Sequence, residues 1–171
     1  LRKAGLEIAD EESGVHHISS ESRVDEGFWI AVLPFKVVGP STELGTLALG
    51  ISEEIVTGFS RFSYLRVMAP GSTSKYSQSG DLRQIGAELG ARYVMEGSIR
   101  QAGSTVRLAV QLVDASNGAH LWAETFDRHF QPDQIFAMQD ELIPRIVSTC
   151  ADHFGVLARS ISNAVRGKES S

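Results

Sequence analysis

The stretch RYVMEGSIRQAGSTVRLAVQLVDASNGAHLWAETFD, residues 92–127, decides the fold. Its central part, residues 104–114, alternates apolar with polar or small side chains, which is the two-residue period of a strand with one buried face. Strands are also predicted for residues 92–99 and 119–127, and RQAG is the predicted turn before the central strand. Because short turns join these three strands, the sequence predicts an antiparallel meander.

The second turn of this meander contains Asn117 and Gly118, the residue pair that type I′ turns prefer because both central residues need a positive φ. In the strand that follows, Trp122 alternates with His120 and Glu124. The two-residue period therefore predicts that these three side chains share one face of the sheet, with Phe126 continuing it.

Upstream of the meander, IAVLPF at residues 30–35 is a continuous apolar run, as expected for a strand covered on both faces, and Pro34 predicts that its ladder stops there. A helix is predicted next from an apolar stripe at steps of three and four, formed by Leu44, Leu47, Ala48, Ile51, Ile55, Phe59 and Phe62. YLRVMAP, residues 64–70, is a short second strand. A compact helix follows, between a cap at Asp81, with Gln84 at capping-box spacing, and Gly90.

The last predicted core helix, PDQIFAMQDELIPRIVSTC, covers residues 132–150 and contains Pro144, which removes one hydrogen bond and should bend or break the helix. The order of elements is thus β-α-β-α-β-β-β-α. The first two connections are long enough for parallel crossovers, and the later ones are hairpins. The sequence predicts an α/β fold with a mixed sheet and helices packed on it.

The domain boundaries follow from composition. Residues 1–26 lack a sustained period and have the composition of a linker or loosely ordered segment, whereas residues 27–150 contain the predicted elements. Residues 151–171 are expected to form a further helix and a polar tail leading to other domains. Since the chain begins with Leu1 instead of Met, we expect it to be an excised piece of a longer protein.

Composition limits the classes of function. The 171 residues include 16 Lys and Arg against 21 Asp and Glu, for a net charge of −5, and no basic cluster of the kind that binds a phosphate backbone. Direct nucleic-acid binding is therefore not expected. The apolar stretches are too short to span a bilayer, so no direct membrane contact is expected and we predict a cytoplasmic protein, or a periplasmic one if an export signal lies upstream.

No catalytic, cofactor or metal site is predicted. GPSTELGT lacks the Gly-Lys-Ser/Thr of a phosphate-binding loop, and neither GISEE nor GSTS fits a nucleophile elbow. His16 and His17 are adjacent without a third ligand, and the single cysteine, Cys150, occupies an apolar helix position.

Several polar residues are candidates for acid/base chemistry by residue type, and structural roles are favoured for them. Glu96 is the most interesting because it stands in an apolar strand beside Gly97, where burial would require a partner such as Arg100, Arg107 or a backbone donor. His120 and His129 have no nucleophile or orienting carboxylate identifiable from spacing. The other carboxylates considered are Glu53, Glu54, Asp114, Glu124 and Asp127.

The order of these segments resembles the TolB amino-terminal-like domain over residues 29–147. The resemblance is carried by IAVLPF (30–35), GISEEIVTGFSRFSYLRVMAP (50–70), DLRQIGAELGARYVMEGSIRQAGSTVRLAVQLVDASNGAHLWAETFDR (81–128) and IFAMQDELIPRIV (135–147). It implies a module without catalytic residues in bacterial signalling proteins. There the module stands between an effector, either a class III adenylate cyclase or a CadC-type winged-helix domain, and tetratricopeptide repeats.

The sequence therefore predicts a non-catalytic regulatory or protein-interaction domain, which contacts partner proteins or neighbouring domains and has the edge strands to form homo-oligomers. One alternative is a small-ligand or nucleotide-binding α/β domain, with a pocket lined by residues 36–46 and 70–80. Another is a periplasmic interaction domain like that of TolB.

Overall fold

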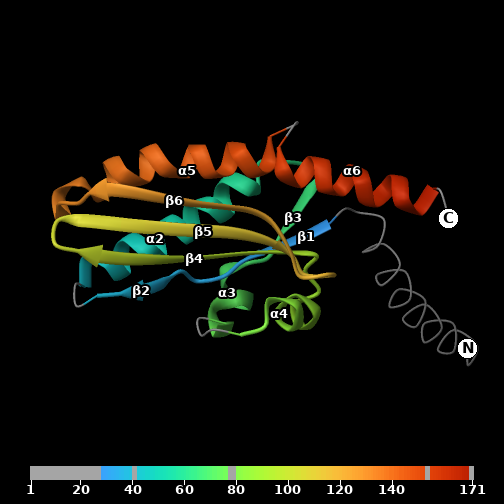
Figure 1. Cartoon of the computed structure of the whole chain (residues 1–171), viewed down its shortest axis with the longest axis horizontal. Helices are drawn as coiled ribbons and strands as arrows, with labels where there is room; N and C mark the ends of the chain where they lie inside the picture. The colour runs from blue at the N-terminus through green and yellow to red at the C-terminus, as the bar shows by residue number, and fades with distance from the viewer. Residues whose placement is uncertain (1–27, 40–41, 77–79, 153–154, 170–171) are drawn as a thin grey trace, which may run out of the picture.

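The fold is a mixed sheet with helices on both faces (Figure 1). The computed structural model describes residues 28–39, 42–76, 80–152 and 155–169. The predicted linker 1–26, including His16 and His17, therefore lies outside the described residues. Within them, the predicted α/β class, with a mixed sheet and helices packed on it, is confirmed.

Over the described part of the chain, the sheet has six strands in the order β3-β1-β4-β5-β6, with β2 paired to β4 off this path. Their bounds are β1 Phe28–Val32, β2 Lys36–Val38, β3 Leu65–Val67, β4 Tyr93–Ala102, β5 Thr105–Asp114 and β6 Ala119–His129. The pairs β1–β3, β1–β4 and β2–β4 are parallel, whereas β4–β5 and β5–β6 are antiparallel. The predicted crossovers and the predicted meander are therefore both present.

Strand β2 was not predicted, and it corrects the expectation that the ladder stops at Pro34. Pairing with β4 is interrupted there, after the Leu33 amide donates to the Met95 carbonyl at 2.9 Å. The ladder then resumes, with Lys36 opposite Ser98. Proline removes only its own donor. Residues 33–35 therefore lie outside the register, and the chain then pairs with β4 again.

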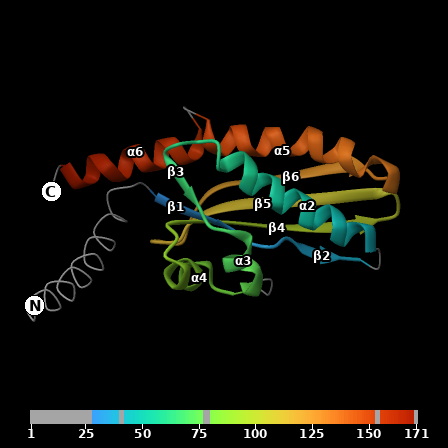
Figure 2. The same cartoon turned by 180° about the vertical axis from the view of Figure 1, so that it is seen from behind.

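The helices divide between the two faces of the sheet. Their bounds, with two 3₁₀ turns, are α2 Thr42–Phe59, α3 Pro70–Thr73, η1 Ser74–Tyr76, α4 Leu82–Leu89, η2 Pro132–Gln134, α5 Ile135–Ala151 and α6 Val156–Glu169. Figure 2 shows α2 crossing one face beside α5, whereas α3 and α4 lie on the other side. The caps of α4 are confirmed, because the Asp81 carboxylate accepts from the Arg83 amide at 3.0 Å and Gly90 has φ +73°.

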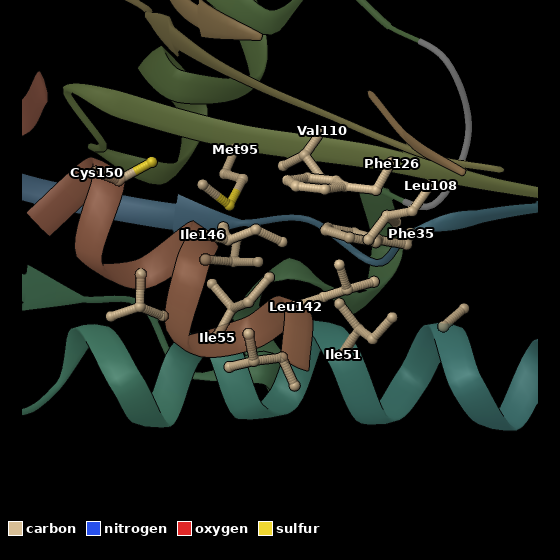
Figure 3. Close-up of a cluster of buried hydrophobic side chains, with 14 of the residues drawn as sticks. Phe35, Ile51, Ile55, Met95, Leu108, Val110, Phe126, Leu142, Ile146 and Cys150 are labelled. Carbon is tan, nitrogen blue, oxygen red and sulfur yellow. The ribbon is translucent and has the colours of Figure 1, made fainter. Parts of the chain in front are cut away.

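The main core lies between the sheet and the pair of helices α2 and α5. Figure 3 shows Met95 and Val110 from the sheet facing Ile55 of α2 and Ile146 of α5. The two helices approach closely where α2 carries glycine, since a Cβ added at Gly58 would lie 2.7 Å from a methyl of Val147. Burial of the apolar side chains between the sheet and these two helices contributes most to the stability of the fold.

Pro144 neither ends nor breaks α5, which continues from Ile135 to Ala151. The proline lies on the exposed side of the helix, where water can solvate the carbonyl that has lost its donor. The next helix, α6, is anchored at its start, because Leu157 is fully buried and the Ser160 hydroxyl lies 3.0 Å from that of Tyr93. Figure 1 shows α6 running on past the end of the sheet.

The predicted type I′ turn between β5 and β6 is wrong. No described residue other than glycine has a positive φ, so Asn117 does not adopt the required conformation, and only Gly118 does, at φ +76°. Asp114 reorganises the turn, because its carboxylate accepts from both the amide and the hydroxyl of Ser116. Likewise β4 extends through RQA, and the β4–β5 turn consists of Gly103 and Ser104.

The second face of the sheet is only partly covered. Near β1 and the start of β4, α4 packs on a small apolar cluster of Leu33, Ile85, Val94 and Ala115. Towards β2 and the far ends of β4, β5 and β6, no described helix lies over the strands (Figure 1). The same face therefore changes from apolar and covered to polar and open.

Candidate functional site

The open part of the sheet presents a set of side chains that we call the polar sheet face. The strand register places them in three rows that run across the sheet: Glu96–Gln111–Ala123, Lys36–Ser98–Ala109–Thr125 and Val38–Arg100–Arg107–Asp127. Directly paired residues point to the same side of a sheet, so each row forms a continuous strip. In the central row, Ser98, Ala109 and Thr125 are small, and the rows on either side of it carry larger side chains such as Gln111 and Arg107.

This arrangement creates a shallow cavity of about 530 Å³. Its floor is formed by the small residues Ser98, Ala109 and Thr125, and Lys36, Glu96 and Arg100 are among the residues that surround them. Lining side chains therefore come from the three consecutive strands β4, β5 and β6 and from β2, which is distant from them in the sequence. The alternation of β5 predicted its contribution, whereas that of β2 could not be foreseen without the strand itself.

The electrostatics of the face are unbalanced. Arg100 and Arg107 are directly opposed on neighbouring strands, a like-charge pairing that is unfavourable. Arg107 is compensated by two hydrogen bonds to Asp127, of 2.7 and 3.0 Å, and Arg107 holds the pKa of that carboxyl below its usual value. Arg100 is exposed and has no acidic partner within the described ranges.

Glu96 lies on this face and is half-buried. Its carboxylate accepts a hydrogen bond from the Gln111 amide directly across the strand pair. The partner is thus a neutral side chain, not Arg100, Arg107 or a backbone donor as the sequence suggests. A carboxylate held by a neutral amide keeps its charge available to a further partner.

Asp114 is a structural residue at the end of β5. Its buried carboxylate receives two hydrogen bonds from Arg92, at 2.8 and 3.1 Å, and two from Ser116. Burial alone would raise the pKa of Asp114, but the hydrogen bonds from Arg92 and Ser116 outweigh it and the pKa is lowered. These four hydrogen bonds attach the β5–β6 turn to the residue that precedes β4, so the carboxylate of Asp114 has a structural role.

The two histidines of β6 are not brought together. His120 and His129 are exposed near opposite ends of the strand, roughly 30 Å apart at about 3.3 Å per residue. The prediction that His120 shares a face with Trp122 is wrong, because a register shift leaves Leu121 unpaired. His120 consequently lies opposite Val113, whereas Trp122 lies opposite Leu112 and packs against the main core.

The remaining candidates have ordinary structural positions. Glu53 and Glu54 lie on the exposed side of α2, and Glu124 forms a 2.9 Å ion pair with Arg145 of α5. Cys150 is fully buried, and this burial, with Glu124 nearby, raises the pKa of its thiol to about 12. Among the residues that the structure describes, no group of three or more His, Cys, Asp or Glu is arranged to hold a metal ion.

The alternative of a ligand-binding domain predicts a pocket lined by residues 36–46 and 70–80, of which residues 40–41 and 77–79 lie outside the described residues. Residues 36–38 are strand β2, and Lys36 and Val38 line the cavity on the polar sheet face. Residues 70–76 form α3 and η1 on the part of the sheet near α4, and none of them lines that cavity. Among the described residues, this cavity is therefore lined by the first segment and not by the second.

The geometry defines a class of site. It combines an open, strand-built surface, a small-residue floor, one arginine without a carboxylate and one carboxylate with a neutral partner. Neither histidine of β6 makes a side-chain hydrogen bond to another described residue that could orient it for proton transfer. Such a surface is suited to contacting another protein surface or a small polar ligand.

Comparison with known proteins agrees with a regulatory module. Residues 26–145 match the family described as "HilA/YgeH-like transcriptional regulator, second domain". The chain belongs to this family. It is also 44% identical over 120 residues to "Putative adenylate cyclase 3" of Rhizobium meliloti (strain 1021), a match that covers 70% of this chain and 20% of that protein. The chain thus spans about one fifth of the curated relative it matches.

A solved structure supports the fold. Lipoprotein GNA1162 from Neisseria meningitidis superposes with a TM-score of 0.51 at 14% identity, covering 72% of this chain and 98% of that chain. TolB from Acinetobacter baumannii matches with a TM-score of 0.48 at 17% identity, covering 71% of this chain and 28% of that chain. The expected relation to regulatory proteins is confirmed at the level of the family, whereas the winged-helix and tetratricopeptide neighbours stay a prediction.

None of the described helices combines the length and the apolar character that crossing a membrane requires.

Proposed function

We propose that the chain is a non-catalytic regulatory domain whose polar sheet face docks against another domain of the same multidomain signalling protein. The observation that carries this proposal is the unbalanced pairing of Arg100 with Arg107. Asp127 compensates only one of the two guanidinium groups. A carboxylate on a docking domain would compensate the other and would relieve the like-charge repulsion across β4 and β5.

The shape of the surface supports the same proposal. Ser98, Ala109 and Thr125 give a floor that a bulky side chain of a partner can approach closely. At the rim, Val38 of β2 is 48% exposed. Among the strands that the structure describes, β2 pairs with β4 alone, so its outer edge also offers backbone groups to a docking segment.

The comparisons indicate a setting for such a domain. The matching family is named as the second domain of a transcriptional regulator, and the Rhizobium relative, named as an adenylate cyclase, is about five times longer than the matched segment. In this proposal the domain works in the cytoplasm, between an adenylate cyclase or CadC-type winged-helix effector and tetratricopeptide repeats. It transmits the state of one neighbour to the other through its sheet face.

A second candidate function is binding of a small anionic ligand in the cavity. Lys36 and Arg100 line the same 530 Å³ space and favour a phosphate or carboxylate group. Calorimetry against ATP, GTP and cyclic AMP separates the two functions, since saturable heat that is lost in Arg100→Ala would favour the ligand. The alternative of a periplasmic interaction domain requires an export signal in the full-length gene, which sequencing that gene would reveal.

The docking proposal is tested by filling the floor of the face. Ala109→Trp in the full-length gene product is expected to change effector output by about fivefold or more, because typical allosteric coupling free energies correspond to at least this factor. The output is measured as cyclic AMP or as reporter transcription. Ala87→Trp on the exposed side of α4 is the matched control and is expected to leave the output unchanged.

The stability of both variants is measured in parallel by urea unfolding of the 171-residue chain. Ala109 is only half-buried and lines the cavity. The free energy of unfolding of Ala109→Trp should therefore lie within about 0.5 kcal/mol of that of the unsubstituted chain. An output of Ala109→Trp equal to that of Ala87→Trp, with both variants folded, would contradict docking through this face.

A further inference from the structure

A second hollow lies on the opposite side of the molecule, between α2 and α5. The two helices run side by side in the same direction on the covered face of the sheet (Figure 2). Between them is a groove of about 710 Å³. We call it the α2/α5 groove, and its lining residues are Glu54, Thr57, Gly58, Arg61, Phe62, Gln139, Asp140, Ile143, Pro144, Val147, Ser148 and Asp152.

The floor of the groove is apolar. Ile143 and Val147 are 6% and 8% exposed, and Gly58 leaves room for the Val147 methyl groups because it has no side chain. Phe62, which is half-buried, and Pro144 extend the apolar lining. Both walls are helices without open sheet edges, so the recognition mode that fits is a helix laid into a groove, not an added strand.

The rim of the groove is acidic. Among the described lining residues, Glu54, Asp140 and Asp152 contribute three carboxylates, whereas Arg61 is the one cation. Within the described parts of the chain, none of these three carboxylates has a cationic partner. Pro144 adds an acceptor, because it has no N–H to donate to the carbonyl of Asp140 one turn earlier.

We propose that the α2/α5 groove binds an amphipathic helix of a partner protein that has apolar residues along one stripe and lysine or arginine on its flanks. The apolar stripe covers Ile143 and Val147, and the basic flanks pair with Glu54, Asp140 and Asp152. Between Gln139 and Asp152 the wall formed by α5 measures about 20 Å, at 1.5 Å per residue, which matches a partner helix of about 14 residues. This surface does not overlap the polar sheet face, so either proposal can fail alone.

The test uses a synthetic peptide as the probe. A fluorescein-labelled helix of about 14 residues, built only from leucine at helical stripe positions and lysine elsewhere, is titrated with the 171-residue chain while anisotropy is recorded. Saturable binding is expected, with amide shift changes in nuclear magnetic resonance spectra confined to α2 and α5. Charge reversal in Asp140→Lys or Glu54→Lys is expected to weaken binding about tenfold, a loss of about 1.4 kcal/mol.

The control variant is Asp133→Lys, which makes the same change of charge at an exposed position outside the groove. It should bind like the unsubstituted chain, and a peptide with glutamate in place of lysine should not bind. The proposal is overturned if the lysine peptide does not bind, if Asp133→Lys weakens binding as much as Asp140→Lys, or if the glutamate peptide binds equally well. Sedimentation showing a dimer that dissociates in Asp140→Lys would overturn it too, by assigning the groove to a second copy.

Discussion

Gly97→Val is expected to lower the free energy of unfolding by about 3 kcal/mol, the upper end of the usual cost of overpacking. A Cβ at position 97 would lie 2.7 to 2.9 Å from three ring carbons of Phe35. That ring is 7% exposed and belongs to the main core, where it lies near Leu108 and Phe126 (Figure 3). It has no free space into which it can withdraw.

The matched control for Gly97→Val is Ser98→Val at the next position of β4. Ser98 is half-exposed and points into the open cavity, so the added methyl groups meet no core side chain. Valine favours strands at both positions, and Ser98→Val should therefore stay within about 0.5 kcal/mol of the unsubstituted chain. Equal stability of the two variants in urea unfolding would mean that Phe35 does not pack on Gly97.

Asp114→Ala is expected to lower the free energy of unfolding by about 3 kcal/mol, because it breaks a buried ion pair. The Asp114 side chain is 5% exposed and its carboxylate accepts from Arg92 and Ser116. Asp127→Ala removes a pair of the same bidentate geometry with Arg107, but there the two side chains are 48% and 61% exposed. No resolvable loss is expected for this control, and a loss equal to that of Asp114→Ala would contradict the structural role of Asp114.

The same carboxylate makes stability depend on pH. Because the folded-state pKa of Asp114 is lowered, its contribution is complete above the unfolded value, which is about 3.9, and is lost as the pH falls through the folded value. Unfolding monitored by circular dichroism should therefore show a steeper loss of stability below about pH 4 in the unsubstituted chain than in Asp114→Asn.

Local signals predicted most of the fold correctly. Alternation over residues 104–114 located β5, and the stripe from Leu44 to Phe59 located α2, because in both cases one buried face imposes a period on the sequence. Asp81 and Gly90 marked both ends of α4, since capping depends only on neighbouring backbone groups. These features are local, and a single sequence is enough to read them.

The errors arose where specific contacts, several of them between distant residues, override the local pattern. β2 exists because β4 offers it pairing beyond Pro34, and Gly97 is required by Phe35, which lies far from it in the sequence. The side chain of Asp114 overrides the turn preference of Asn117 and Gly118, and an unpaired Leu121 turns His120 to the other face. The polar sheet face could not be predicted for the same reason, because its rows of side chains form only when four strands pair in the observed register.

The central claim, that the polar sheet face is a docking surface, is tested most directly by the reactivity of a single cysteine placed on it. Thr125→Cys puts a thiol on the exposed face, whereas the native thiol of Cys150 is buried and has a pKa of about 12, so it should not compete. The rate of maleimide labelling is measured in the 171-residue chain and in the full-length gene product, with Ala87→Cys on α4 as the reference. We expect Thr125→Cys to react at least about tenfold more slowly in the full-length protein, while Ala87→Cys reacts at the same rate in both. Equal rates for Thr125→Cys in the two contexts would contradict the claim.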